Sequence, residues 1–130
     1  KSLNLKEGAN KFLFKLLTAF QGKKEIECTI YLWSHKTKII ISDIDGTITK
    51  SDLLGHVFPL IGKHWYHTGI SKLYNKIIDQ GYKIVYVTMR PIGYSRLTRN
   101  QLNSMVVDNF KMPSGPLMVC PLGLISSSMV

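Results

Sequence analysis

A run of isoleucines that leads into two aspartates constrains the fold of this chain most. Ile39 to Ile41 form a continuous apolar run, and Ser42 then precedes the sequence Asp-Ile-Asp-Gly-Thr. Such a run is typical of a central parallel strand that is buried on both faces. Side chains two apart on a strand share a face, so Asp43 and Asp45 are expected together at the strand's carboxyl end. We therefore expect an α/β protein that binds its ligand at this edge of the sheet.

The two aspartates suit phosphoryl transfer. A hard cation such as Mg²⁺ prefers oxygen ligands and bridges to phosphate, so both Asp43 and Asp45 are candidate metal ligands. One carboxylate can attack phosphorus while the other moves a proton, and we assign Asp43 as the nucleophile and Asp45 as the acid/base. Gly46 permits a sharp turn, and the Thr47 hydroxyl can steady the loop or Asp45. A plain strand-ending turn is the simpler alternative, whereas a calcium loop is excluded because its twelfth position is Leu54.

The rest of the chain alternates predicted strands and helices. Residues 26–33 alternate in a strand pattern, whereas residues 11–20 fit helical and strand spacing equally. After the glycine-punctuated stretch 55–62, the pattern predicts helices over 70–78 and 95–107 and strands over 82–88 and 116–119. Four residues, Ile70, Leu73, Ile77 and Ile78, share one face of the first helix, which Gly81 should end. The order predicts a doubly wound parallel sheet.

A second group of residues could hold the phosphoryl group. Thr88 ends the predicted strand 82–88 at the same sheet edge as Asp43, where its hydroxyl could donate to phosphoryl oxygens. Thr47 is a candidate for the same role. Arg90, two residues beyond Thr88, either contacts phosphate or lies on the surface. Three histidines, His56, His64 and His67, are interpreted as surface or loop-packing residues because no further metal-ligand spacing accompanies them. Trp65 either lines a substrate entrance or packs.

Charge narrows the class of partner. The 17 basic residues against 8 acidic ones give a net charge of +9, which favours an anionic partner such as a phosphorylated substrate or an acidic membrane surface. Only Lys23 and Lys24 are adjacent lysines, so no nucleic-acid-binding arm is indicated. Cys28 and Cys120 lie far apart, which indicates neither a zinc site nor a disulfide framework. The most apolar stretch, 116–125, contains prolines and is too short for a transmembrane helix.

These motifs resemble those of a known family. The pattern DxDGT after an apolar run is similar to the signature of the haloacid dehalogenase superfamily. More specifically, the block ISDIDGTITKSD at 41–52 resembles the lipin-type phosphatidate phosphatases. Further similar residues are Gly55, His56, Gly62, Lys63, Trp65, His67, Gly69, Ile70, Lys72, Leu73 and Tyr74, with LNLKEGAN at 3–10 and TIYLW at 29–33.

The resemblance implies a fold and an activity. Residues 1–36 would be β strands of an immunoglobulin-like sandwich, and residues 37–130 a haloacid-dehalogenase-like (Rossmann-like) catalytic domain. The implied activity is Mg²⁺-dependent hydrolysis of phosphatidate to diacylglycerol and phosphate through an aspartyl-phosphate at Asp43. The implied location is cytoplasmic, peripheral on the endoplasmic reticulum or nuclear membrane, at an anionic surface that contains phosphatidate.

The chain also departs from the family pattern. Thr88, Met89 and Arg90 stand where lipins have Ser-Ala-Arg, and His64 stands where an acidic residue is usual. The superfamily also needs a later lysine and a later acid, but after Thr88 only Lys111 and Asp108 occur, near the end of the second predicted helix. We therefore expect the catalytic domain to be C-terminally incomplete, and the isolated 130 residues to be inactive or nearly so.

Two other functions fit the same residues. Related domains in membrane-associated phosphatidylinositol transfer proteins share the implied fold and recognise phosphatidate without hydrolysing it, so a lipid-sensing module is one alternative. A superfamily phosphatase with a soluble or protein substrate is the other. The complete set of Asp43, Asp45 and Thr47 favours catalysis over lipid sensing.

Overall fold

A computed structural model of the chain describes residues 3–20, 22–50 and 66–120, and it divides into two compact units, residues 1–37 and 38–130. The predictions that concern residues 55–62, His56, His64 and Trp65 lie outside the described residues. No helix among the described residues is long and apolar enough to cross a membrane.

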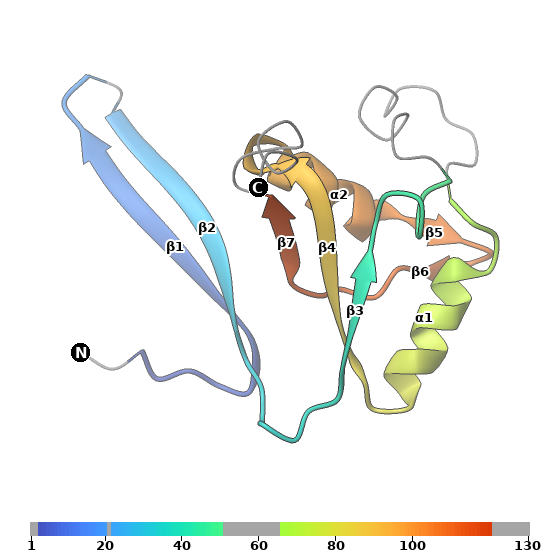
Figure 1. The fold of residues 1–130 in the computed structure, drawn as a ribbon. Helices are drawn as coiled ribbons and strands as arrows, with labels where there is room; N and C mark the ends of the chain where they lie inside the picture. Colours follow the sequence, from blue (N-terminus) through green and yellow to red (C-terminus); the bar gives the residue numbers. More distant parts are fainter. Residues whose placement is uncertain (1–2, 21, 51–65, 121–130) are drawn as a thin grey trace, which may run out of the picture. The chain divides into compact units, whose positions relative to one another are not determined.

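The first unit is a β hairpin. Strands β1 (Gly8–Thr18) and β2 (Gly22–Leu32) pair antiparallel, with Phe14 opposite Ile26 (Figure 1). The ambiguous stretch 11–20 therefore lies mostly in a strand. Its alternation places Lys11 and Lys15 where they form exposed ion pairs with glutamates of β2, at 3.6 and 3.9 Å. The described residues of this unit form this one ribbon, and the sandwich stays a prediction.

The second unit is a mixed α/β fold around a parallel sheet. Its elements are β3 (Ile39–Asp43), α1 (Ile70–Asp79), β4 (Lys83–Pro91), the 3₁₀ turn η1 (Ile92–Tyr94), α2 (Ser95–Ser104), β5 (Val106–Val107), β6 (Phe110–Lys111) and β7 (Leu117–Cys120). The sheet has the order β3-β4-β7, and both pairings are parallel. The predicted parallel sheet is thus confirmed.

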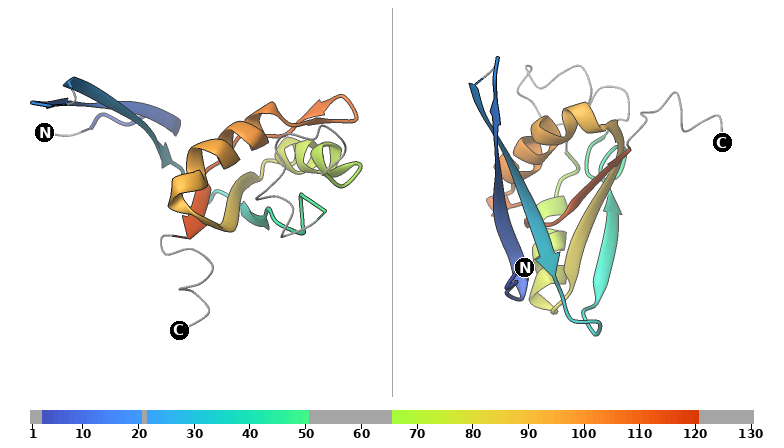
Figure 2. Two further views of the ribbon diagram at one scale, coloured as in Figure 1. Left: turned by 90° about the horizontal axis from the view of Figure 1, so that it is seen from above. Right: turned by 90° about the vertical axis from the view of Figure 1, so that its left-hand side faces the viewer.

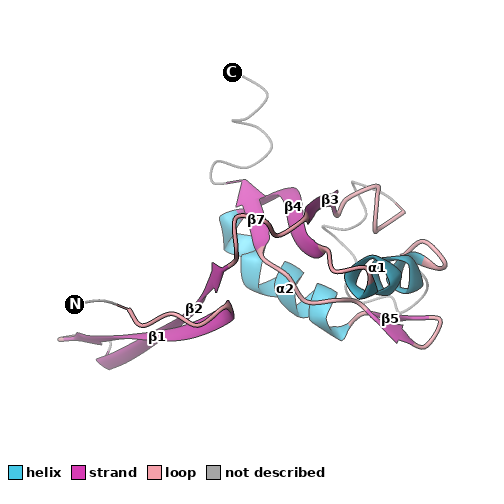
Figure 3. Cartoon of the chain, turned by 90° about the horizontal axis from the view of Figure 1, so that it is seen from below, coloured by secondary structure: helices cyan, strands magenta, loops and turns pink. Residues whose placement is uncertain are grey.

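Both helices lie on the same face of this sheet, as the views from above and below show (Figures 2 and 3). The doubly wound pattern would place helices on both faces, and the strand order explains the difference. Each crossover moves one strand further in the same direction, from β3 to β4 and from β4 to β7. Crossovers of one hand that move in one direction must place their helices on one side.

The core fills the space between the sheet and the helices. Its buried members are Ile44, Ile48, Tyr74, Ile84, Tyr86, Leu102, Met105 and Met112. The prediction that the isoleucine run forms a central strand buried on both faces is wrong for the described chain. β4 is central, and β3 is the edge strand, with Ile39 48% and Ile41 68% exposed. The apolar run indicated a parallel strand but could not indicate its place in the sheet.

The helices differ from the predictions in detail. α1 ends as expected before Gly81, whose φ of 84° suits glycine, but it buries Tyr74 and leaves Leu73 51% exposed. α2 ends at Ser104, because the next residues form the small hairpin β5–β6. Asp108 and Asn109 make its turn with φ of 53° and 66°, a two-residue turn of the kind that joins antiparallel strands.

Candidate active site

The candidate site begins where β3 ends. The Ile44 amide donates to the Val87 carbonyl of β4 at 3.1 Å and to Asp43 Oδ1 at 2.9 Å. The chain then turns through Gly46, whose φ is 83°. The Thr49 hydroxyl closes the turn, since it accepts from the Gly46 amide at 3.3 Å and donates to the Ile44 carbonyl at 3.2 Å. Thr47, predicted to steady this loop, is exposed.

Asp45 is held by two residues of β4. Its Oδ2 accepts from the Thr88 hydroxyl at 2.6 Å, and its Oδ1 accepts from Nε and Nη2 of Arg90 at 3.1 and 2.6 Å. The Asp45 side chain is 13% exposed and that of Arg90 only 3%. The structure thus brings together three of the predicted site residues. The burial of Arg90 excludes the alternative that it lies on the surface.

Arg90 also reaches helix α2, which the sequence patterns had not indicated. Its Nη1 donates to Thr98 Oγ1 at 3.3 Å and to Gln101 Oε1 at 3.0 Å. Thr98 is 1% exposed, and the neighbouring Leu102 belongs to the core. Thr98 and Gln101 are three residues apart and therefore share a helix face, and Leu102 beside them is in the core. Polar residues on a helix face that turns toward the core indicate a polar partner inside the protein.

Asp43 has different surroundings from Asp45. It is exposed, and within the described part of the chain no donor other than the Ile44 amide reaches its carboxylate. Because β3 ends at Asp43, the strand alternation that predicted one shared face does not extend to Asp45. The Asp43 carboxylate is therefore available to a ligand, whereas the Asp45 carboxylate is held by Thr88 and Arg90.

Polar contacts tie the strands of the site to their neighbours. The Ser42 and Tyr74 hydroxyls lie 2.5 Å apart and connect β3 to α1, while the Tyr86 hydroxyl donates to the Pro113 carbonyl at 2.6 Å. Burial, with a smaller contribution from the nearby Tyr74, raises the pKa of Tyr86 well above its ordinary value. Tyr86 therefore stays neutral as a hydrogen-bond donor inside the core.

The donor set fits a hard cation that leaves most of its coordination to water and phosphate. Among residues 3–20, 22–50 and 66–120, no three His, Cys, Asp or Glu side chains gather as a metal cage, and His67 is exposed. Mg²⁺ commonly binds through one or two carboxylates, waters and substrate phosphates. Asp43 has the exposure that this mode requires, whereas the Asp45 carboxylate already accepts three hydrogen bonds.

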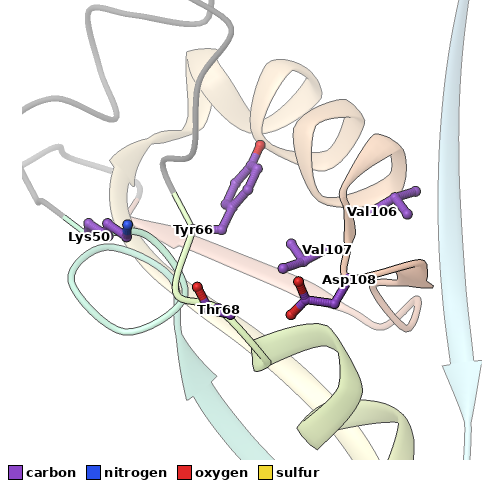
Figure 4. Close-up of a pocket in the computed structure, with 6 residues that line it drawn as sticks. All are labelled: Lys50, Tyr66, Thr68, Val106, Val107 and Asp108. Carbon is purple, nitrogen blue, oxygen red and sulfur yellow. The ribbon is translucent and has the colours of Figure 1, made fainter.

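A cavity of about 350 Å³ lies beside the end of the loop that follows β3, at Lys50 (Figure 4). The described residues that line it are Lys50, Tyr66, Thr68, Val106, Val107 and Asp108. Lys50 and Asp108 stand on opposite sides in Figure 4. Asp108 Oδ2 accepts from the Gly69 amide at 2.8 Å, so this carboxylate is bound to the start of α1. Asp43 and Asp45 do not line this cavity.

Comparisons with known proteins agree on one group of relatives. The sequence model of the family described as LNS2 (Lipin/Ned1/Smp2) matches residues 1–130. The chain is similar to the human phosphatidate phosphatase LPIN1, with 48% identity over 98% of the chain and 14% of the relative. It is similar to phosphatidate phosphatase PAH1 of Arabidopsis thaliana, with 45% identity over 95% of the chain and 14% of the relative. Phosphatidic acid phosphohydrolase 1 of Saccharomyces cerevisiae is 43% identical over 93% of the chain. The chain spans about one seventh of the length of these relatives.

Proposed function

Because the chain belongs to the LNS2 (Lipin/Ned1/Smp2) family, we propose that it forms the nucleophile-bearing part of a Mg²⁺-dependent phosphatidate phosphatase. The reaction converts phosphatidate to diacylglycerol and phosphate. One observation carries the proposal: an exposed carboxylate, Asp43, stands at the end of a parallel strand, two residues before a second carboxylate, Asp45, that side chains of β4 hold in place. This proposal includes a haloacid-dehalogenase-like fold for residues 37–130 and an immunoglobulin-like sandwich to which β1 and β2 contribute.

The two carboxylates divide the reaction between them. A carboxylate oxygen of Asp43 attacks phosphorus, and the bond from phosphorus to the glycerol oxygen breaks as Asp45 donates a proton to that oxygen. Water then attacks the aspartyl-phosphate and gives a proton to Asp45, which releases phosphate and restores the Asp43 carboxylate and the protonated Asp45 with which the reaction began. Oδ1 of Asp45 accepts two N–H groups from the buried Arg90, whereas Oδ2 accepts one hydroxyl, that of Thr88, which can rotate, so Oδ2 is our candidate for proton exchange.

The proposed cation would bind at the same edge of the sheet. Asp43 and Asp45 are the carboxylates that would contribute to its binding, and Mg²⁺ would supply positive charge next to the phosphoryl oxygens. Thr47 follows Asp45 by two residues, is exposed, and is our candidate donor to the phosphoryl group. Thr88 was assigned the same role, but its hydroxyl donates to Asp45 in this structure.

The names of the relatives and the charge of the chain support our proposal for the substrate and its location. The names of the relatives state phosphatidate phosphatase activity, and a net charge of +9 favours an anionic lipid surface. We propose that the protein acts peripherally on the cytoplasmic side of the endoplasmic reticulum or nuclear membrane, at bilayers that contain phosphatidate.

The test is phosphate release from phosphatidate in mixed micelles with Mg²⁺, measured for the full-length protein. Asp43→Asn should reduce the rate to background, because an amide is a poor nucleophile. Asp79→Asn is the matched control, since it removes an exposed carboxylate from the end of α1 and should keep full activity. Equal rates for the wild-type protein and Asp43→Asn would overturn the proposal. Binding of phosphatidate vesicles without any turnover would instead support the lipid-sensing alternative.

A further inference from the structure

Arg90 occupies an unusual position for a residue at a substrate-binding edge. Its side chain is 3% exposed, whereas Asp43 at the same end of the sheet is exposed. Each of its three guanidinium nitrogens donates to a side chain of the protein. Nε and Nη2 donate to Asp45, and Nη1 donates to Thr98 and Gln101 of α2. The planar guanidinium therefore joins Asp45, in the loop that follows β3, to helix α2, which comes much later in the sequence.

These contacts argue against direct binding of the phosphoryl group by Arg90. To reach a phosphate, the guanidinium would have to leave Asp45 or its partners on α2, and polar groups shielded from water would then lose their hydrogen-bond partners. The backbone supports the same arrangement, since the Arg90 amide donates to the Thr88 hydroxyl at 3.1 Å and that hydroxyl donates to Asp45. Both β4 side chains thus act on one carboxylate.

We infer that Arg90 is a positioning residue that fixes the orientation of Asp45, and that Thr98 and Gln101 in turn fix Arg90. This inference rests on the proposed function, in which Asp45 exchanges a proton with the leaving oxygen and with water. The guanidinium is rigid and planar, so the bonds from Nη1 to Thr98 and Gln101 also fix the positions of Nε and Nη2, which donate to Asp45. Without them the guanidinium can tilt, and Asp45 is no longer held in one place. A displacement of about 1 Å at a catalytic group can cost about 100-fold in rate.

The experiment compares two double variants of the full-length protein. Thr98→Val with Gln101→Met removes both acceptors while nearly preserving volume. Thr98→Ser with Gln101→Glu keeps an acceptor oxygen at both positions. A third variant, Asn100→Ala, changes an exposed residue of α2 and serves as the control. The kcat and KM for phosphatidate are measured with Mg²⁺, and circular dichroism and thermal unfolding show whether each variant is folded.

We expect kcat of the Thr98→Val, Gln101→Met variant to fall by about 10- to 100-fold, with KM within about twofold of wild type. The acceptor-retaining variant and Asn100→Ala should stay within about threefold of wild type. Should the double variant fail to fold, Gln101→Met alone is the test, because Gln101 is only partly buried. Its kcat should fall by about threefold or more.

Three results from the variants would overturn the inference alone. A rise in KM at unchanged kcat would mean that Arg90 binds the phosphoryl group directly. Equal losses in both double variants would mean that α2 requires these residues for packing and not for the acceptors. Unchanged kinetics in all variants would mean that the contacts to α2 do not position Arg90. A wild-type protein without activity would overturn the proposed function itself, and the inference with it, before any variant is compared.

Discussion

Replacement of Gly115 by alanine should destabilise the sheet that carries the site. Gly115 precedes β7, and a Cβ built on it would lie 2.3 Å from the Ile84 carbonyl oxygen and 3.4 Å from the Tyr86 ring. Ordinary van der Waals contact begins at 3.4 Å, so the Ile84 oxygen is too close by about 1 Å. The two nearest atoms, the carbonyl oxygen and carbon of Ile84, belong to the backbone and cannot rotate away. The segment before β7 must therefore move from β4.

The size of the effect follows from what that movement breaks. Overpacking of this kind costs about 1–3 kcal/mol. The same movement strains the hydrogen bonds from the Tyr86 amide to the Pro116 carbonyl, at 2.8 Å, and from the Tyr86 hydroxyl to the Pro113 carbonyl, at 2.6 Å. Each contributes about 1 kcal/mol. We expect Gly115→Ala to lower the free energy of unfolding of this unit by about 3 kcal/mol.

Hydrogen exchange followed by mass spectrometry can measure this loss in the full-length protein, because peptides from β4 report on this unit alone. A loss of about 3 kcal/mol should speed exchange of β4 amides by more than about 100-fold. Gly93→Ala is the matched control, since its Cβ meets nothing within 4 Å and its φ is not positive. It should leave exchange unchanged or slow it slightly. Equal exchange rates in both variants would refute the steric reasoning.

Three further predictions concern other parts of the unit and the chain as a whole. Burial raises the pKa of Tyr86 above its ordinary value of 10, so the Tyr86 hydroxyl of the unfolded chain loses its proton first as pH rises. The free energy of unfolding should therefore be unaffected by Tyr86 below about pH 10 and should fall as pH rises above it. Denaturant titrations of the wild-type protein and Tyr86→Phe should therefore differ in alkaline slope by about 1.4 kcal/mol per pH unit, and equal slopes would contradict the assignment. Gly81→Ala should destabilise the end of α1 by about 1 kcal/mol because φ is 84° there, seen as faster exchange in α1 peptides, and unchanged exchange would count against it. The isolated 130-residue chain should release little or no phosphate from phosphatidate with Mg²⁺, because Lys111 and Asp108 are its only lysine and acid after Thr88 and Asp108 is bound to the Gly69 amide, and rapid turnover would contradict this reasoning.

The sequence predicted the parallel strands and α1 because the spacing of their apolar residues indicates a buried strand or the buried face of a helix. Strand order does not appear in such spacing, which is why the apolar run at Ile39 to Ile41 was assigned to the centre of the sheet and not to its edge. The end of α2 was missed for a related reason. Val106 and Val107 fit the helical spacing, but the left-handed turn at Asp108 and Asn109 diverts them into a hairpin.

The candidate site shows the same limit. Asp43, Asp45 and Thr88 could be assigned to one sheet edge because parallel strands share the direction of their carboxyl ends. The pairing of Arg90 with Asp45 joins residues 45 apart, and no local spacing indicates it. Thr47 was predicted to steady the loop, but the Thr49 hydroxyl closes the turn, because which threonine faces inward depends on how the chain turns after Gly46.

The bond between the Asp108 carboxylate and the Gly69 amide has a consequence for how the chain folds during synthesis. α1 has no side-chain cap of its own and no acidic residue in its first turn, and its ten residues are too few for a stable isolated helix. Its N-terminal partner is supplied 39 residues later, and the Asn75 side chain also donates to the Lys111 carbonyl at 2.8 Å. On the ribosome α1 should therefore stay only partly helical until the β5–β6 hairpin has emerged. We expect a nascent chain that stops near residue 90 to be a better chaperone or protease substrate than one that includes the hairpin.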